Sequence, residues 1–160
     1  MLWRWHVLMP LLAALCGYVP ARRLGWMEDT PSGVARHWSR MGPRFERSLT
    51  RGCTTGPGAD ELVHRFGAVT APILALGLND DPFGTPTAID RLLAYFTAAD
   101  RHHLRLEAAA LGFTQIGHFA FFHERFRDTL WPLARAWLQD QRITMLPGAT
   151  VITWPGAREA

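Results

Sequence analysis

The feature that most constrains the fold is a continuous apolar segment in the middle of the chain. Residues 71–78 (APILALGL) carry no charged side chain, and the polar turn Asn-Asp-Asp-Pro follows them directly. A run of this length that is apolar throughout, rather than alternating, indicates a strand buried on both faces. Such strands occur mainly in parallel sheets that are covered by helices. The sequence therefore predicts an α/β fold.

The segments around this strand fit the same class. A short helix is expected over residues 59–66, and another begins at Thr85, whose side chain can cap a helix that opens with proline. A second strand is expected at residues 103–107, where leucines alternate with charged side chains. A loop containing glycine then leads to residues 116–122 (IGHFAFF). Together these segments predict a strand, helix, strand unit followed by a loop.

The remaining segments complete a three-part organisation. Residues 1–58 are predicted to form a helical segment and a linker, of which residues 44–58 are loop-like. Residues 59–140 form the α/β part, which ends in an amphipathic helical region around residues 126–137. Residues 141–160 contain two prolines and little periodicity, so we expect an irregular, poorly packed tail.

The N-terminal apolar run raises the question of a membrane segment. It extends over residues 7–19, about 13 residues against the ~20 that span a bilayer, and Pro10 interrupts it. No small-x-small cleavage site follows, and Leu15 before Cys16 does not suit lipoprotein processing. We expect a kinked apolar helix that packs on a protein partner, in a cytoplasmic protein; membrane association is the weaker alternative.

Composition excludes several other functions. The net charge is +3, and all 17 basic residues are arginine, spread along the chain without a basic stripe. This pattern does not predict binding to nucleic acid. Cys16 and Cys53 lack the spacing of metal ligands, and no phosphate loop or dinucleotide fingerprint occurs. His102 and His103 would point to opposite faces of a strand, which argues against a metal ion that they share. We therefore expect no metal and no cofactor.

An acidic turn after one strand and a histidine loop after the next place candidate catalytic groups together. The carboxyl ends of parallel strands meet at one edge of the sheet, where α/β proteins bind ligands. In a hydrolytic triad, a carboxylate orients an imidazole that activates a hydroxyl group. The order of acid and then histidine is that of α/β-hydrolases. An Asp-Asp-Pro turn is also typical of an Asx-turn or a helix cap, so the turn alone does not identify a site.

These segments resemble a known family. APILALGLNDDPFG, followed by IGHFAFFHERFRDTLWP, is similar to the C-terminal half of predicted α/β-hydrolases related to serine aminopeptidase-like and monoacylglycerol-lipase-like enzymes. The upstream segment GYVPARRLGWMEDTPSGVARHWSR resembles their cap. The resemblance covers about residues 1–139. It implies a partial α/β-hydrolase fold with cap helices and the last two parallel strands.

The resemblance also implies roles for individual residues. His118 takes the place of the general base, and Gly117 allows the turn that presents it. For the acid, the distance from Pro72 and the proline at position 82 both favour Asp81. The Gly-x-x-Asp pattern counted from Gly77 favours Asp80 instead, so Asp80 stays as the alternative acid.

The nucleophile of the family is missing from the sequence. A serine hydrolase needs a Gly-x-Ser-x-Gly elbow, but the chain has only three serines, and none lies in that pattern; they are Ser32, Ser39 and Ser48. We therefore expect a truncated α/β-hydrolase, with Met1 at an internal position of a longer ancestor, that is inactive by itself. Its sheet should present an unpaired edge. The nucleophile half could be supplied in trans, and the parent substrate would be a small ester or related acyl compound.

A different class of function stays open beside the hydrolase. A small membrane-associated or partner-binding protein without catalytic activity would use the N-terminal apolar helix as its contact surface. In that case, Asp81 and His118 would be scaffold residues.

Overall fold

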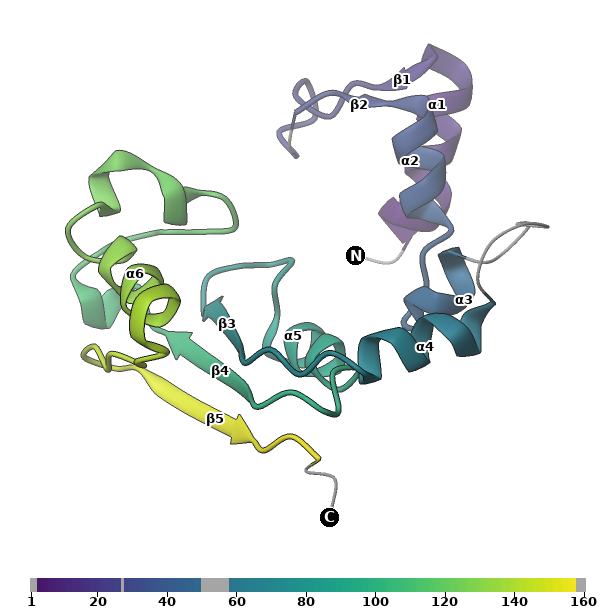
Figure 1. Ribbon diagram of the computed structural model, residues 1–160. Coiled ribbons are helices and arrows are strands. Elements are labelled where there is room, and N and C mark those ends of the chain that lie inside the picture. The colour runs from purple at the N-terminus through teal and green to yellow at the C-terminus, as the bar shows by residue number, and fades with distance from the viewer. Residues whose placement is uncertain (1–2, 27, 50–57, 158–160) are drawn as a thin grey trace. The chain divides into compact units, whose positions relative to one another are not determined.

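The computed structural model describes residues 3–26, 28–49 and 58–157, and the chain divides into two compact units, Met1–Leu62 and Val63–Ala160 (Figure 1). The division falls inside helix α4 (Ala59–Gly67), slightly beyond the predicted boundary after residue 58. Each unit has its own cluster of buried apolar side chains.

The N-terminal unit is mainly helical. A π-helical segment, Arg4–Leu8, continues directly into α1 (Met9–Cys16), which has Pro10 in its first turn and ends at Gly17 in a left-handed conformation (φ 77°). The two-residue strands β1 (Tyr18–Val19) and β2 (Thr30–Pro31) pair in antiparallel fashion, and α2 (Ser32–Ser39) follows. The sequence predicted a kinked apolar helix here, and the structure has a change from π-helix to α-helix next to Pro10.

The core of the N-terminal unit is small. Among the described residues of this unit, it consists of five buried side chains that come from α1, the β1 region and α2; these are Met9, Ala13, Val19, Ala21 and Ala35. The expectation of a loop over residues 44–58 is wrong at its start, because α3 occupies Phe45–Leu49. Residues 50–57 of that segment, Cys53 among them, lie outside the described residues.

The C-terminal unit contains a three-stranded sheet in the order β3-β4-β5. Strand β3 (Ile73–Leu78) pairs in parallel with β4 (Arg101–Leu106), from Ile73 opposite Arg101 to Leu78 opposite Leu106. Helix α5 (Pro86–Leu93) connects the two strands, and the Thr85 side chain caps it as expected. The observed class is therefore α/β, with a parallel pair joined by a helical crossover.

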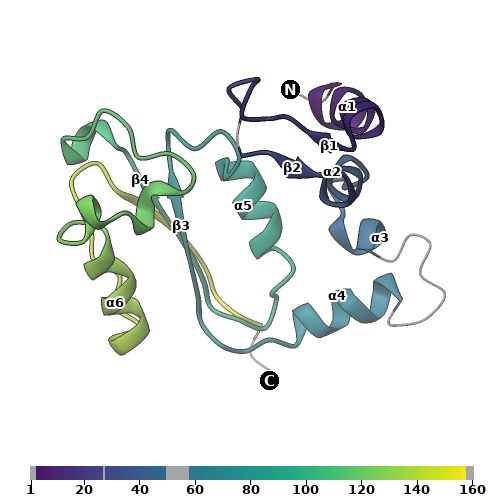
Figure 2. The same cartoon turned by 90° about the horizontal axis from the view of Figure 1, so that it is seen from above.

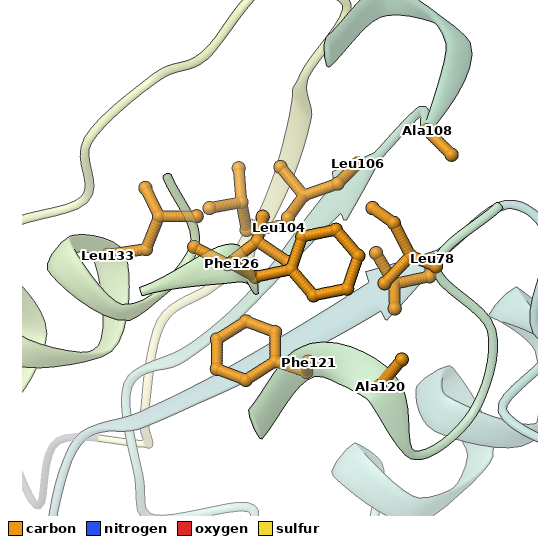
Figure 3. Packing of buried hydrophobic residues seen from close by; sticks show 10 residues of the cluster. Leu78, Leu104, Leu106, Ala108, Ala120, Phe121, Phe126 and Leu133 are labelled. Carbon is orange, nitrogen blue, oxygen red and sulfur yellow. The ribbon is translucent and has the colours of Figure 1, made fainter. Parts of the chain in front are cut away.

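The helices cover both faces of this sheet, as Figure 2 shows. Helix α5 lies on one face, whereas α6 (Trp131–Asp140) and the loops before it lie on the other. The buried cluster on the α6 face joins side chains from both strands to those loops and to α6 (Figure 3); it comprises Leu78, Leu104, Leu106, Ala108, Ile116, Ala120, Phe121, Phe126, Leu130 and Leu133. Two 3-10 turns, Ala120–Phe122 and Glu124–Phe126, contribute Ala120, Phe121 and Phe126 to this cluster, and Leu111 of the turn Ala109–Leu111 packs against it.

The expectation of an irregular tail is wrong for its second half. Residues Thr150–Trp154 form β5, which pairs in antiparallel fashion with β4. The segment TVITW is rich in β-branched and aromatic residues that favour strands, and the prolines at positions 147 and 155 lie outside it. Ile143, Leu146 and Ala149 pack against the buried cluster, so the segment that leads to β5 is also packed.

Strand β3 lies at an edge of the sheet in the described part of the chain. Its backbone pairs with β4 on one side, and the sheet order places no strand on the other. Its first four residues are only half-buried, whereas Gly77 and Leu78 are buried. Natural edge strands are usually protected by charge, proline or a bulge, and the segment ILALGL carries no charged residue or proline.

Candidate active site

The candidate site lies where β3 and β4 end. Because the two strands are parallel, the polar turn after β3 and the loop after β4 leave the sheet at the same edge. The side chain of Asn79 already links the two, since its Oδ1 atom accepts a hydrogen bond from the N–H of Ala108 at 3.1 Å.

Asp81 and His118 are brought together at this edge. Oδ2 of Asp81 lies 2.8 Å from Nδ1 of His118, and the side chains are 10% and 38% exposed, respectively. An ionised carboxylate can only accept a hydrogen bond, so this contact requires the hydrogen on Nδ1. In the neutral imidazole, the lone pair is then on Nε2, where it can accept a proton.

The surroundings of Asp81 favour its ionised form. Partial burial raises the pKa of this carboxyl. The hydrogen bonds from His118 and from the backbone N–H groups of Gly84 and Phe83 lower this pKa, and together they outweigh the effect of burial. The balance holds the pKa of Asp81 below its usual value. The N–H of Phe83 donates to Oδ1 at 2.8 Å. The acid is therefore charged at neutral pH and can stabilise a protonated imidazole.

Aromatic rings flank the imidazole. The ring centroids of Phe83 and Phe119 lie 5.2 Å and 4.5 Å from that of His118. Phe119 and Phe122 are 74% and 78% exposed, so the loop that carries His118 presents apolar surface to solvent beside it.

Asp80, the alternative acid, lies elsewhere in the same site. Its Oδ2 atom accepts hydrogen bonds from the backbone N–H groups of Ile116 at 2.7 Å and Gly117 at 3.0 Å. Gly117 adopts a left-handed conformation (φ 73°), which glycine tolerates without strain. The structure thus brings the side chain of Asp81, and not that of Asp80, into hydrogen-bond contact with the imidazole.

The serines of the described chain make local contacts in the N-terminal unit. The hydroxyl of Ser39 donates to the carbonyl of Arg36 at 2.9 Å, and the hydroxyl of Ser48 accepts from the N–H of Gly42 at 2.9 Å. Ser32 begins α2. Ser32 directly follows the two-residue strand β2, but Thr30 and Val34 stand where a nucleophile elbow has its glycines.

A second histidine–aspartate pair was not predicted from the sequence. On the α5 face of the sheet, Nδ1 of fully buried His103 lies 2.6 Å from Oδ1 of Asp90, and Arg105 donates to Oδ2 of Asp90 at 2.7 Å. His103 and Arg105 are two apart on β4 and so share a face, which is a signal the sequence contains. Asp90 lies on α5, and only the crossover brings it to His103 and Arg105.

The two adjacent histidines point to opposite faces of β4, as predicted. Nδ1 of His102 lies 3.0 Å from the hydroxyl oxygen of Thr153, and its ring is 5.3 Å from that of Trp137 on α6. Across residues 3–26, 28–49 and 58–157, no group of three or more His, Cys, Asp or Glu side chains is placed to hold a metal ion.

Comparison with known proteins gives no match. No protein-family model matches the chain, and neither the curated proteins nor the solved structures show significant similarity to it.

Proposed function

We propose that the C-terminal unit is the acid–base part of a serine hydrolase of the α/β-hydrolase type, acting on ester or related acyl bonds. In this proposal Asp81 orients the imidazole, and His118 is the general base. The observation that carries it is the 2.8 Å contact between Oδ2 of Asp81 and Nδ1 of His118 at the carboxyl ends of two parallel strands.

In this reaction, one polypeptide segment would supply the serine nucleophile, and the C-terminal unit would supply the general base and its acid. A serine hydroxyl outside these 160 residues loses its proton to Nε2 of His118 as its oxygen attacks the carbonyl carbon of the substrate. The imidazolium then returns the proton to the leaving alcohol, and Asp81 stays ionised throughout. A water molecule releases the acyl group by the same route. Asp81 and His118 alone give at most weak general-base activity.

The open edge of β3 offers a place where a polypeptide that carries the missing nucleophile could pair with the sheet. A polypeptide that supplies a nucleophile elbow would also supply a strand for this edge, in the same gene product or as a separate chain. A cytoplasmic location belongs to this proposal.

The test is complementation. The DNA upstream of the codon for Met1 is read for a frame that encodes a Gly-x-Ser-x-Gly elbow, and its product is produced together with this chain. We expect hydrolysis of p-nitrophenyl butyrate only when both are present. His118→Gln should reduce the rate by about 10³-fold or more. The control His123→Gln, which alters an exposed histidine in the same loop, should not.

Two results would contradict the proposal. One is an upstream sequence without such an elbow. The other is an ester hydrolysis rate that stays unchanged when His118 or Asp81 is replaced.

One observation supports the second candidate, a partner-binding protein without catalytic activity. Four large apolar side chains at four-residue spacing, each with at least half of its surface exposed, form a stripe along the first helical segment; they are Trp3, Val7, Leu11 and Leu15. Met9 and Ala13 on the other face of this segment are buried. A helix that is apolar all round is usually covered on both sides.

The type of surface that this stripe contacts can be tested by vesicle flotation. None of the helices in the described part of the chain combines the length and apolarity that a bilayer crossing requires. For a protein partner, we expect the chain not to float with neutral phosphatidylcholine vesicles. Flotation that is lost in Leu11→Glu would instead indicate a membrane surface.

A further inference from the structure

Three consecutive side chains after β3 form hydrogen bonds with different residues of the segment that follows β4. Asn79, Asp80 and Asp81 each accept a hydrogen bond from this later segment. The donors are, in the same order, the N–H of Ala108, the N–H groups of Ile116 and Gly117, and the imidazole of His118. The order along the turn thus matches the order along the segment.

The middle contact lies directly before the imidazole. One oxygen of Asp80 accepts two backbone hydrogen bonds, at 2.7 Å and 3.0 Å, from the two residues that precede His118. Both of these residues are buried. The backbone turns at Gly117 with a left-handed φ of 73°, so a small rotation there would move the imidazole away from Asp81. The contact therefore fixes the backbone from which His118 extends.

We propose that Asp80 is a positioning residue, whose carboxylate holds the backbone before His118 so that the imidazole reaches Asp81. This inference rests on the proposed catalytic role of His118 for its functional meaning. The hydrogen bonds that support it are independent of any reaction.

The chemistry of Asp80 suits this role better than that of a second acid. A charged acceptor makes hydrogen bonds about twice as strong as a neutral one, and here one oxygen receives two N–H groups. The other oxygen, Oδ1, is buried and has no hydrogen-bond partner within the described residues. Asparagine would keep an oxygen acceptor without the charge, whereas alanine would remove the acceptor entirely.

The test is a carbon-13 NMR titration of the Asp81 carboxyl in the full chain. In Asp80→Ala we expect the imidazole to leave Asp81, so that the pKa of Asp81 rises, as we also expect in His118→Ala. Loss of the negative charge of Asp80 would by itself lower the pKa of Asp81, because a neighbouring carboxylate disfavours ionisation. A rise therefore reports the lost hydrogen bond.

The double variant separates positioning from an independent effect. If Asp80 acts through His118, adding Asp80→Ala to His118→Ala should not raise the pKa of Asp81 further. The conservative Asp80→Asn should give a smaller rise than Asp80→Ala. Asp128→Asn, which removes an exposed charge from the same unit, should leave the pKa of Asp81 unchanged.

Folding is monitored in the same samples through hydrogen exchange at the amide of Leu104, a buried residue of β4. An unchanged or lowered pKa of Asp81 in folded Asp80→Ala would overturn the inference, and so would effects of Asp80→Ala and His118→Ala that add. If the alanine variant unfolds, Asp80→Asn decides by comparison of two backgrounds. Its effect on the pKa of Asp81 should be more positive in the chain with His118 than in His118→Ala, where only the charge effect remains, and equal effects would overturn the inference. Failure of complementation would contradict the proposed function and leave these pKa results untouched.

Discussion

Asp90 on α5 and His103 on β4 form a hydrogen bond of 2.6 Å on the face of the sheet opposite α6. It resembles the pair Asp81–His118 in its atoms, but its surroundings are different. His103 is fully buried, and its Nε2 atom has no hydrogen-bond partner among the described residues. The Cα of Gly77 lies against Nε2, so closely that a β-carbon there would be only 2.6 Å from that atom. A substrate cannot reach this imidazole, which makes the pair structural.

Replacing His103 should therefore destabilise the fold. In His103→Ala, a cavity forms, and Asp90 loses one of its two partners while it remains partly buried. We expect the free energy of unfolding to fall by about 2–4 kcal/mol. The matched control is the adjacent His102→Ala on the other face, where the less buried side chain should cost about 1 kcal/mol or less. Urea unfolding of both variants gives the comparison, and equal losses would contradict the structural role.

Gly84 is required by the close approach of Asp81. A β-carbon at position 84 would collide with Oδ2 of Asp81, the atom that binds His118. We expect Gly84→Ala to displace the carboxylate, to lower the free energy of unfolding by about 1–2 kcal/mol, and to reduce the hydrolysis rate in the complementation assay. The control is Gly33→Ala in α2, where a β-carbon meets no atom within 4 Å. A Gly84→Ala variant as active and stable as the control would refute this assignment.

The C-terminal unit was predictable from the sequence where the signal is local. The apolar run at 71–78, the cap at Thr85 and the acidic turn each depend on neighbouring residues, and the structure has β3, α5 and the turn there. The second strand was expected at 103–107 and spans Arg101–Leu106. Asp81 reaches His118 because parallel strands end at one edge, a relation that follows from topology alone.

The features that were missed depend on contacts between distant segments. Strand β5 is short and half-exposed, and its pairing with β4 joins residues about 50 positions apart, such as His103 and Ile152. The two prolines that flank this strand led to the prediction of an irregular tail. The link from Asp90 to His103 and the contacts of Asp80 with the backbone before His118 likewise cross between elements. Local pattern carries no information on such pairings.

The lowered pKa of Asp81 gives the fold a defined pH dependence. A carboxyl whose pKa is lower in the folded chain stabilises that state above the unfolded pKa of about 3.9, and this stability is lost as the pH falls through the folded value. We expect Asp81→Asn to be about 1 kcal/mol less stable than the unaltered chain at about pH 5. The difference should shrink toward about pH 2. Urea unfolding across this range measures it, and a difference that is constant with pH would contradict the cause given for the shift.

Removal of β5 should expose the second edge of the sheet. A chain that ends at Gly148 would leave β4 without its antiparallel neighbour, and the cluster on the α6 face would lose its contact with Ala149. With β3 already at an edge, the remaining pair β3–β4 would be open on both sides, and isolated two-stranded sheets are only marginally stable. We expect a loss of about 2 kcal/mol or more in unfolding free energy, together with aggregation that increases with protein concentration. Light scattering and urea unfolding test this. A shortened chain that stays monomeric and equally stable would show that β5 is dispensable and that the tail is peripheral after all.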